Sequence, residues 1–124
     1  SMSQHILNTV ASGGCPVQVM MGWDYQMQQY FLNVEVLDDD WVPPPGSDLT
    51  PSENGYLYSN LNDDYVCPVD QQLSYYQGWA ARFGILLPPS LITNVTYDRS
   101  VNRRVYKVMY QPDGSFQVVT PSPF

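Results

Sequence analysis

A chain of 124 residues, 44% of them hydrophobic and 14% aromatic, has enough apolar material for one folded domain, which excludes a disordered tail. The net charge of −7 disfavours nucleic-acid binding, because an acidic protein and a phosphate backbone repel each other. The charge is also unevenly placed, since all but two of the twelve acids precede Arg82, the first Arg or Lys of the chain. Such opposite patches permit self-association.

The first residues carry no targeting signal. Ser1 before Met2 resembles the remnant of a cleaved tag, so Ser1 is set aside. No basic stretch precedes an apolar run, and no apolar run approaches the roughly twenty residues of a membrane helix. We therefore expect a cytoplasmic protein without a membrane segment. Residues 1–15 are expected to form an N-terminal segment that precedes a single domain of residues 16–124.

Two segments near the start of this domain predict an antiparallel hairpin. Residues 16–23 alternate between apolar and polar positions, and residues 29–37 do so more cleanly, as strands do. The connection, from Asp24 to Gln28, is longer than the tightest turns. The expected inward positions are Val17, Val19, Met21, Trp23, Tyr30, Leu32, Val34 and Val36.

Residues 38–54 break this pattern with three consecutive aspartates, Pro43-Pro44-Pro45 and Gly46. Proline lacks the amide donor that a central strand needs, and neighbouring acids repel each other. The segment therefore predicts a long acidic, proline-rich surface loop. Tyr56-Leu57-Tyr58 then predicts a short strand.

A helix is predicted between Asp70, which can cap its start, and Gly84, which suits the left-handed residue that ends a helix. Arg82 lies in the last turn, where a cation is favoured. Pro88-Pro89-Ser90 predicts the start of a second, shorter helix that reaches about Val95. The inward positions of the first helix recur at helical spacing and are Leu73, Tyr76, Ala80 and Phe83.

Residues 104–110 and 116–120 are rich in strand formers and flank Pro112-Asp113-Gly114, a turn sequence in which proline presets one angle and glycine accepts a left-handed one. They predict a second antiparallel hairpin. The element order is then β-β-β-α-(α)-β-β. This order predicts an α+β fold, with a mainly antiparallel sheet from two hairpins and one main helix packed on one face.

Groups able to perform nucleophilic catalysis are sparse. The single histidine, His5, lies in the N-terminal segment without an evident anchor. Neither Cys15 nor Cys67 lies at a basic helix start that would acidify a thiol. A serine elbow and a phosphate-binding glycine loop are absent from the sequence. We predict that the protein is not an enzyme and that both thiols are reduced, a single disulfide being the alternative.

The acids offer hard oxygen ligands that calcium prefers. Asn60, Asn62 and Asp64 have the alternate spacing that begins a calcium loop, but the sixth position lacks glycine and the twelfth is Gln71 instead of an acid. One histidine and two distant cysteines do not make a zinc site. No metal or cofactor is therefore predicted, and a calcium-binding module remains an alternative.

Aromatic residues beside acids are the strongest binding candidates in the sequence. Rigid rings next to polar loops are typical of recognition surfaces. The alternative is that the loop rings fold back as a lid over a small core. The predicted binding residues are Trp23, Tyr25, Trp41, Tyr56, Tyr58, Asp38, Asp39 and Asp40.

The segments PVQVMMGWD (16–24) and YLYSNLND (56–63) resemble short uncharacterised bacterial proteins that are often encoded on plasmids or other mobile elements. The likeness extends over most of the chain, including the helix that ends near Gly84 and residues 102–104. It implies an intracellular accessory protein of a bacterium, and it implies no activity and no functional residues.

The leading hypothesis is a non-catalytic acidic interaction domain that binds a protein partner, or a second copy of itself, through its acidic aromatic loop face. One alternative is a module that binds a small ligand or calcium between helix and sheet. Another is an inhibitor that imitates the charge of DNA, because the first two-thirds of the chain hold acids and no Lys or Arg. Nucleic acid is an unlikely direct partner, and no membrane partner is expected.

Overall fold

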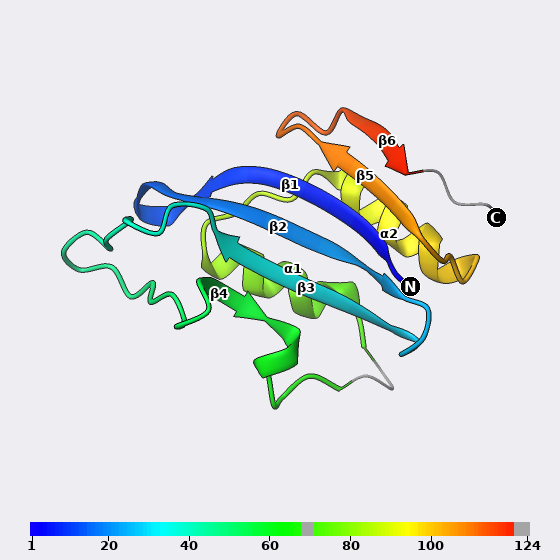
Figure 1. Cartoon of the computed structure of the whole chain (residues 1–124), viewed down its shortest axis with the longest axis horizontal. Helices are drawn as coiled ribbons and strands as arrows, with labels where there is room; N and C mark the ends of the chain where they lie inside the picture. Colours follow the sequence, from blue (N-terminus) through cyan, green and yellow to red (C-terminus); the bar gives the residue numbers. More distant parts are fainter. Residues whose placement is uncertain (68–70, 121–124) are drawn as a thin grey trace.

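The computed structural model describes residues 1–67 and 71–120. Within these residues one six-stranded sheet carries two helices on a single face (Figure 1). The strands follow the spatial order β4-β3-β2-β1-β5-β6. The elements are β1 (Ser3–Ala11), β2 (Cys15–Asp24), β3 (Gln29–Val36), β4 (Tyr56–Ser59), α1 (Leu73–Arg82), α2 (Pro89–Ser100), β5 (Tyr106–Tyr110) and β6 (Phe116–Thr120), with short 3₁₀ turns η1 (Ser12–Gly14) and η2 (Asn60–Asn62).

The predicted α+β class with a mainly antiparallel sheet is confirmed. Every neighbouring pair of strands is antiparallel except β1 and β5, which run parallel. The first predicted hairpin is β2–β3, whose register pairs Val17 with Val36 and Trp23 with Tyr30. The second is β5–β6, whose turn contains Gly114 at a φ of 91°. This positive φ is the reason that glycine is needed there.

The expectation for residues 1–15 was wrong, because Ser3–Ala11 forms β1 between β2 and β5 in the middle of the sheet. Two inward positions of this strand carry the polar residues Ser3 and His5, each fully buried, so the apolar alternation that marks a strand is hidden. Its pairing with β5 also joins segments about a hundred residues apart. No local turn sequence predicts a pairing between strands that are so far apart in the chain.

Two helices, rather than one main helix, cover the sheet. Helix α1 begins at Leu73 after Gln72, while the predicted cap Asp70 lies outside the described residues. Gly84 has a φ of 69°, as expected for the residue that ends this helix. Helix α2 continues five residues beyond the predicted Val95 to Ser100. None of the described helices has both the length and the apolar character needed to cross a membrane.

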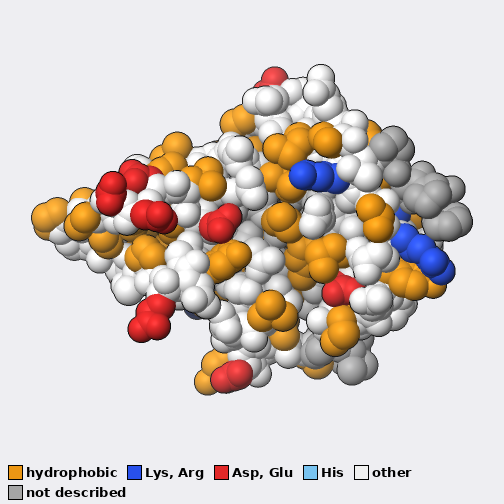
Figure 2. Space-filling view, in the orientation of Figure 1, with side chains coloured by type: hydrophobic (Ala, Val, Ile, Leu, Met, Phe, Trp, Pro, Cys, Tyr) orange, Lys and Arg blue, Asp and Glu red, His pale blue; other side chains and the backbone are white. Residues whose placement is uncertain are grey.

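The main core lies between the sheet and the helices. The inward residues predicted for β2, β3 and α1 are all buried there. No helix of the described residues covers the opposite face of the sheet, and Figure 1 is viewed from that side. Figure 2 shows apolar side chains spread over the centre of this face and acidic ones gathered towards the end with the 38–54 loop.

Candidate functional site

The structure places the eight predicted binding residues at two ends of the sheet. Trp23 and Tyr25 lie at the β2–β3 turn, while the 38–54 loop extends from the opposite end (Figure 1). Tyr56 and Tyr58 lie on the edge strand β4. The first two residues therefore do not share a surface with the others.

Trp23 and Tyr25 hold the segment after α2 against the β2–β3 turn. Trp23 is only 4% exposed, and its indole Nε1 donates to the side-chain oxygen of Asn102 at 2.9 Å. The Tyr25 hydroxyl accepts a hydrogen bond from Arg104 at 2.8 Å, and that guanidinium also lies 4.3 Å above the Tyr25 ring. Both rings thus make internal contacts that join distant segments.

The acidic loop folds back onto the end of the sheet. Trp41 packs on the core, and its Nε1 donates to the carbonyl of Gly13 at 3.2 Å. Leu49, from the same loop, is 6% exposed. A hollow of about 420 Å³ opens beside this anchor, and its lining includes Asp38, Asp39, Trp41, Ser52 and Glu53. The amide of Asp40, next to it, donates to the side chain of Asp38.

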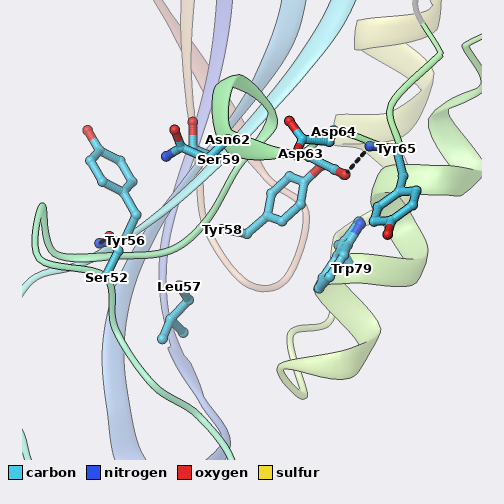
Figure 3. A pocket seen from close by; sticks show the side chains of 10 residues that line it. All are labelled: Ser52, Tyr56, Leu57, Tyr58, Ser59, Asn62, Asp63, Asp64, Tyr65 and Trp79. Atoms are coloured by element: carbon cyan, nitrogen blue, oxygen red, sulfur yellow. Dashed lines mark hydrogen bonds between the residues drawn. The ribbon is translucent and has the colours of Figure 1, made fainter.

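A second hollow, of about 310 Å³, lies between β4 and helix α1 (Figure 3). It shares Ser52 with the first hollow, so the two adjoin. We call this second one the aromatic hollow. Its lining residues are Ser52, Tyr56, Leu57, Tyr58, Ser59, Asn62, Asp63, Asp64, Tyr65 and Trp79.

Asp63 organises the aromatic hollow by binding three of its neighbours. Its Oδ2 accepts hydrogen bonds from the hydroxyls of Tyr58 at 2.5 Å and Tyr75 at 2.6 Å. Its Oδ1 accepts from the amide of Tyr65 at 3.0 Å, the contact drawn in Figure 3. One carboxylate therefore ties the segment after η2 to both β4 and α1.

These hydrogen bonds favour the ionised form of the Asp63 carboxyl. Desolvation of Asp63 works to raise the pKa of its carboxyl, but hydrogen bonds led by those from Tyr58 and Tyr75 outweigh it and hold the pKa below the usual value. The pKa of Tyr58 is raised, first by burial and then by its bond to Asp63. The pKa of Tyr75 is raised chiefly by its bond to Asp63. Near neutral pH the hollow therefore holds an ionised carboxylate and protonated phenols.

Stacked rings from β4 and α1 form one wall of the aromatic hollow. The rings of Tyr58 and Trp79 stack with centroids 4.7 Å apart, and the Arg82 guanidinium lies 4.5 Å from the Trp79 centroid. Tyr65, at the rim, is 89% exposed. Two further hollows meet at Tyr65, one towards Trp79 and Arg82 and the other towards Cys67. Tyr65 is thus the exposed ring at the centre of this surface.

Sequence reasoning selected Tyr56 and Tyr58 for this region but missed Asp63, Tyr65, Tyr75 and Trp79. A signal was present in the helix, where Tyr75 and Trp79 are four residues apart and form a second aromatic stripe beside the core positions. Asn60, Asn62 and Asp64 were weighed as the start of a calcium loop and not as part of an aromatic surface. In the described part of the chain, no group of three or more His, Cys, Asp or Glu side chains is placed to hold a metal ion.

A second cluster of ionisable groups lies under the sheet, and it corrects the expectation that His5 has no anchor. His5 is fully buried, and its Nε2 donates to Oδ2 of Asp98 at 2.5 Å. Oδ1 of Asp98 accepts from Arg103 at 2.8 Å. His5 Nδ1 lies 2.7 Å from the Tyr110 hydroxyl, which accepts from Asn94 at 3.0 Å.

The hydrogen bonds of this cluster assign the tautomer of His5. Burial raises the pKa of Tyr110 to about 12, so this phenol keeps its proton, and in the neutral form of His5 it donates a hydrogen bond to Nδ1. The other ring nitrogen then carries the hydrogen that Asp98 accepts. His5, Asp98 and Tyr110 are each no more than 3% exposed, so the cluster lies in the interior. This cluster braces β1, β5 and α2 against one another.

Cys15 is distant from His5 along β1, and Cys67 is exposed whereas His5 is buried. Cys15 is buried and begins β2 opposite Ala11, at the far end of β1, and Cys67 is exposed in the segment before α1. Both are free thiols in the structure. Burial, with a smaller contribution from Asp38, raises the pKa of Cys15 and so keeps it as a thiol.

Comparison of the chain with protein-family models, with curated proteins and with solved structures finds no match. The geometry of the described residues therefore carries the functional argument.

Proposed function

We propose that this protein is a non-catalytic interaction domain that binds a basic segment of a protein partner in the aromatic hollow. The observation that carries the proposal is the exposed ring of Tyr65 at a hollow walled by stacked Tyr58 and Trp79, beside the carboxylates of Asp63 and Asp64. Aromatic faces and carboxylates together attract Lys and Arg side chains.

The molecule already contains an example of the contact that we propose. Arg82 lies over the Trp79 ring, which is the arrangement that a partner's guanidinium would repeat on the exposed ring of Tyr65. Because Asp63 Oδ2 accepts from the hydroxyls of Tyr58 and Tyr75, these two rings keep their positions without a ligand, and the bond from the Tyr65 amide to Oδ1 holds the backbone at Tyr65. A preorganised surface spends less free energy on ordering its side chains when a partner binds.

The surrounding charge favours an extended basic segment over a single cation. Seven of the twelve acids lie between residues 38 and 64. The hollow beside Asp38, Asp39 and Glu53 adjoins the aromatic hollow at Ser52. A peptide with several basic residues can therefore contact both hollows, and the negative potential would accelerate its association.

The test uses an Arg- and Lys-rich peptide carrying a fluorophore, with fluorescence anisotropy as the readout. Tyr65→Ala removes a ring without changing the charge, so it separates aromatic recognition from general attraction of a polycation. We expect the change to cost ~1–2 kcal/mol, or roughly five- to thirty-fold in affinity. Tyr97→Ala is the matched control, because Tyr97 is also exposed but lies on α2.

Equal affinity for wild type and Tyr65→Ala would contradict the proposal, since only unspecific charge attraction would remain. Equal losses in Tyr65→Ala and Tyr97→Ala would contradict it as well. A double variant, Asp63→Asn with Asp64→Asn, should weaken binding and also reduce its dependence on salt. Circular dichroism confirms in each case that the variant is folded.

A further inference from the structure

The main hydrogen-bond acceptor of the aromatic hollow is already used by the protein itself. A carboxylate has about four acceptor sites on its two oxygens. On Asp63, Oδ2 accepts from the hydroxyls of Tyr58 and Tyr75, and Oδ1 accepts from the amide of Tyr65. The Trp79 side chain gives this carboxylate a further hydrogen bond. Asp63 therefore offers negative charge to the hollow but little capacity to accept a hydrogen bond from a ligand.

The serine oxygens of the lining are engaged in the same way. The hydroxyl oxygens of Ser52 and Ser59 each accept from a nearby backbone amide, at 3.2 Å and 3.3 Å. Among the described lining residues, the other polar side chains are those of Asn62 and Asp64, and both are exposed. The acceptors left over for a ligand therefore belong to exposed side chains, where water competes for them.

The rest of the lining is apolar. It consists of one aliphatic side chain and four aromatic ones, Leu57, Tyr56, Tyr58, Tyr65 and Trp79, of which Tyr65 presents the most exposed ring. The volume of about 310 Å³ is at the lower end of the range of roughly 300–1,000 Å³ found for ligand pockets, so it suits a small head group. The hollow thus combines aromatic surface and a fixed negative charge with few free acceptors.

This combination discriminates between cations by their hydration. A lysine ammonium has three N–H donors and is strongly hydrated, so on entering the hollow it loses hydrogen bonds to water that the lining does not replace. Donors left without a partner are costly, and more so when they are charged. A trimethylammonium group keeps the positive charge but has no N–H donor, and aromatic faces attract it.

We infer that the basic segment of the partner carries a trimethylated lysine, whose trimethylammonium group binds in the aromatic hollow against the exposed ring of Tyr65 and beside the Asp63 carboxylate. This inference rests on the proposed function, since it specifies which side chain of the basic segment enters the hollow. The seven acids between residues 38 and 64 favour this charged group over a neutral group of the same shape.

The test compares two fluorescent peptides that differ at one lysine, which is unmodified in one and trimethylated in the other. Fluorescence anisotropy should show at least about fivefold tighter binding of the trimethylated peptide. A third peptide, with a neutral tert-butyl group in place of the trimethylammonium, should lose this gain, because it has the shape without the charge.

The outcomes separate this inference from the proposed function. Equal affinity of the two lysine peptides, both still weakened by Tyr65→Ala, would overturn the inference and leave the proposed function in place. A tert-butyl peptide that binds as well as the trimethylated one would also overturn the inference. Absence of binding by every peptide would overturn both.

Tyr75→Phe tests the role of the occupied acceptors. It keeps the ring but removes a hydroxyl bound to Oδ2 of Asp63, so it frees an acceptor for an ammonium donor. The preference for the trimethylated peptide should therefore shrink at least about twofold. Tyr97→Phe removes a hydroxyl from an exposed ring on α2 and should keep the wild-type preference. A ratio of two affinities does not depend on the folded fraction of a variant, so an unchanged ratio in Tyr75→Phe would overturn the inference.

Tetramethylammonium, with ammonium as its matched control, separates a free ligand from a lysine side chain. In NMR spectra of the nitrogen-labelled protein, the signals of the Tyr65 amide and the Trp79 indole should shift at lower concentrations of tetramethylammonium than of ammonium. The same response to both ions would overturn the inference. A response to tetramethylammonium without any gain for the trimethylated peptide would overturn the assignment to a lysine of the partner.

Discussion

Asp63 and Asp98 are both carboxylates that join a helix to strands, yet their surroundings differ. Asp63 accepts hydrogen bonds from Tyr58 and Tyr75 at the rim of an open hollow. Asp98 is 1% exposed and accepts from His5 and Arg103 beneath the sheet. The same chemical group therefore contributes to a surface that a partner can reach in one region and to an internal brace in the other.

The difference between the two regions is mainly one of solvent access. Water screens charges at a surface, so contacts there contribute little to folding and remain available for binding. A buried charge depends on its partners, because removing one of them leaves the others without solvation. Substitutions around Asp98 should thus change stability, whereas those around Asp63 should change binding and the response to pH.

The largest effect is expected for Asp98→Ala. It leaves the buried His5 without its acceptor and removes the carboxylate that neutralises Arg103, which should lower the free energy of unfolding by about 3–5 kcal/mol. Urea denaturation followed by circular dichroism measures this loss. Asp39→Ala, in the exposed loop, is the control and should stay close to wild type. A loss below about 1 kcal/mol for Asp98→Ala would show that the cluster is not a brace.

Tyr110→Phe tests the hydrogen bonds that the Tyr110 hydroxyl makes with His5 and Asn94. The substitution keeps the ring but removes the hydroxyl between His5 and Asn94, leaving Nδ1 of His5 without a donor. The free energy of unfolding should fall by about 1–3 kcal/mol. Tyr97→Phe removes a hydroxyl from an exposed ring on α2 and should have almost no effect. Equal stability of the two variants would argue against the assigned hydrogen bonds.

Asp63→Asn should change how stability depends on pH. The pKa of Asp63 is lower in the folded protein than its ordinary value of 3.8, so the ionised carboxylate stabilises the fold above that value. This contribution is lost as the pH falls through the folded pKa. The difference in unfolding free energy between wild type and Asp63→Asn should therefore be constant near neutral pH and shrink in acid. A difference that grows in acid would contradict the assignment.

The smallest change in stability is expected for Tyr65→Ala. Tyr65 is 89% exposed, so the free energy of unfolding should stay within about 0.5 kcal/mol of wild type. The same variant should lose affinity for the basic peptide. A melting temperature well below that of wild type would show that Tyr65 stabilises the fold. The contrast between a surface residue that binds and a buried Asp98 that stabilises would then fail.

Local patterns in the sequence determined much of the fold. The alternation in β2 and β3, the helical spacing of α1 and the Pro-Asp-Gly turn before β6 each depend on neighbouring residues, and all three elements were predicted. Tyr56 and Tyr58 were also selected as binding candidates, because rigid rings next to a polar loop are visible without coordinates. These features follow from periodicity and turn chemistry, which act over a few residues.

Only the tertiary structure decided the position of β1 and the partners of its side chains. The inward His5 looks like a polar surface residue until Asp98 and Tyr110, from the far end of the chain, are brought against it, and the inward Ser3 does so until its hydroxyl accepts from the amide of Trp23. Trp23 and Trp41 likewise became internal contacts through Asn102 and Gly13. Burial and hydrogen bonding between distant segments determine such roles, because a polar side chain is stable in the interior only where the fold supplies its partner.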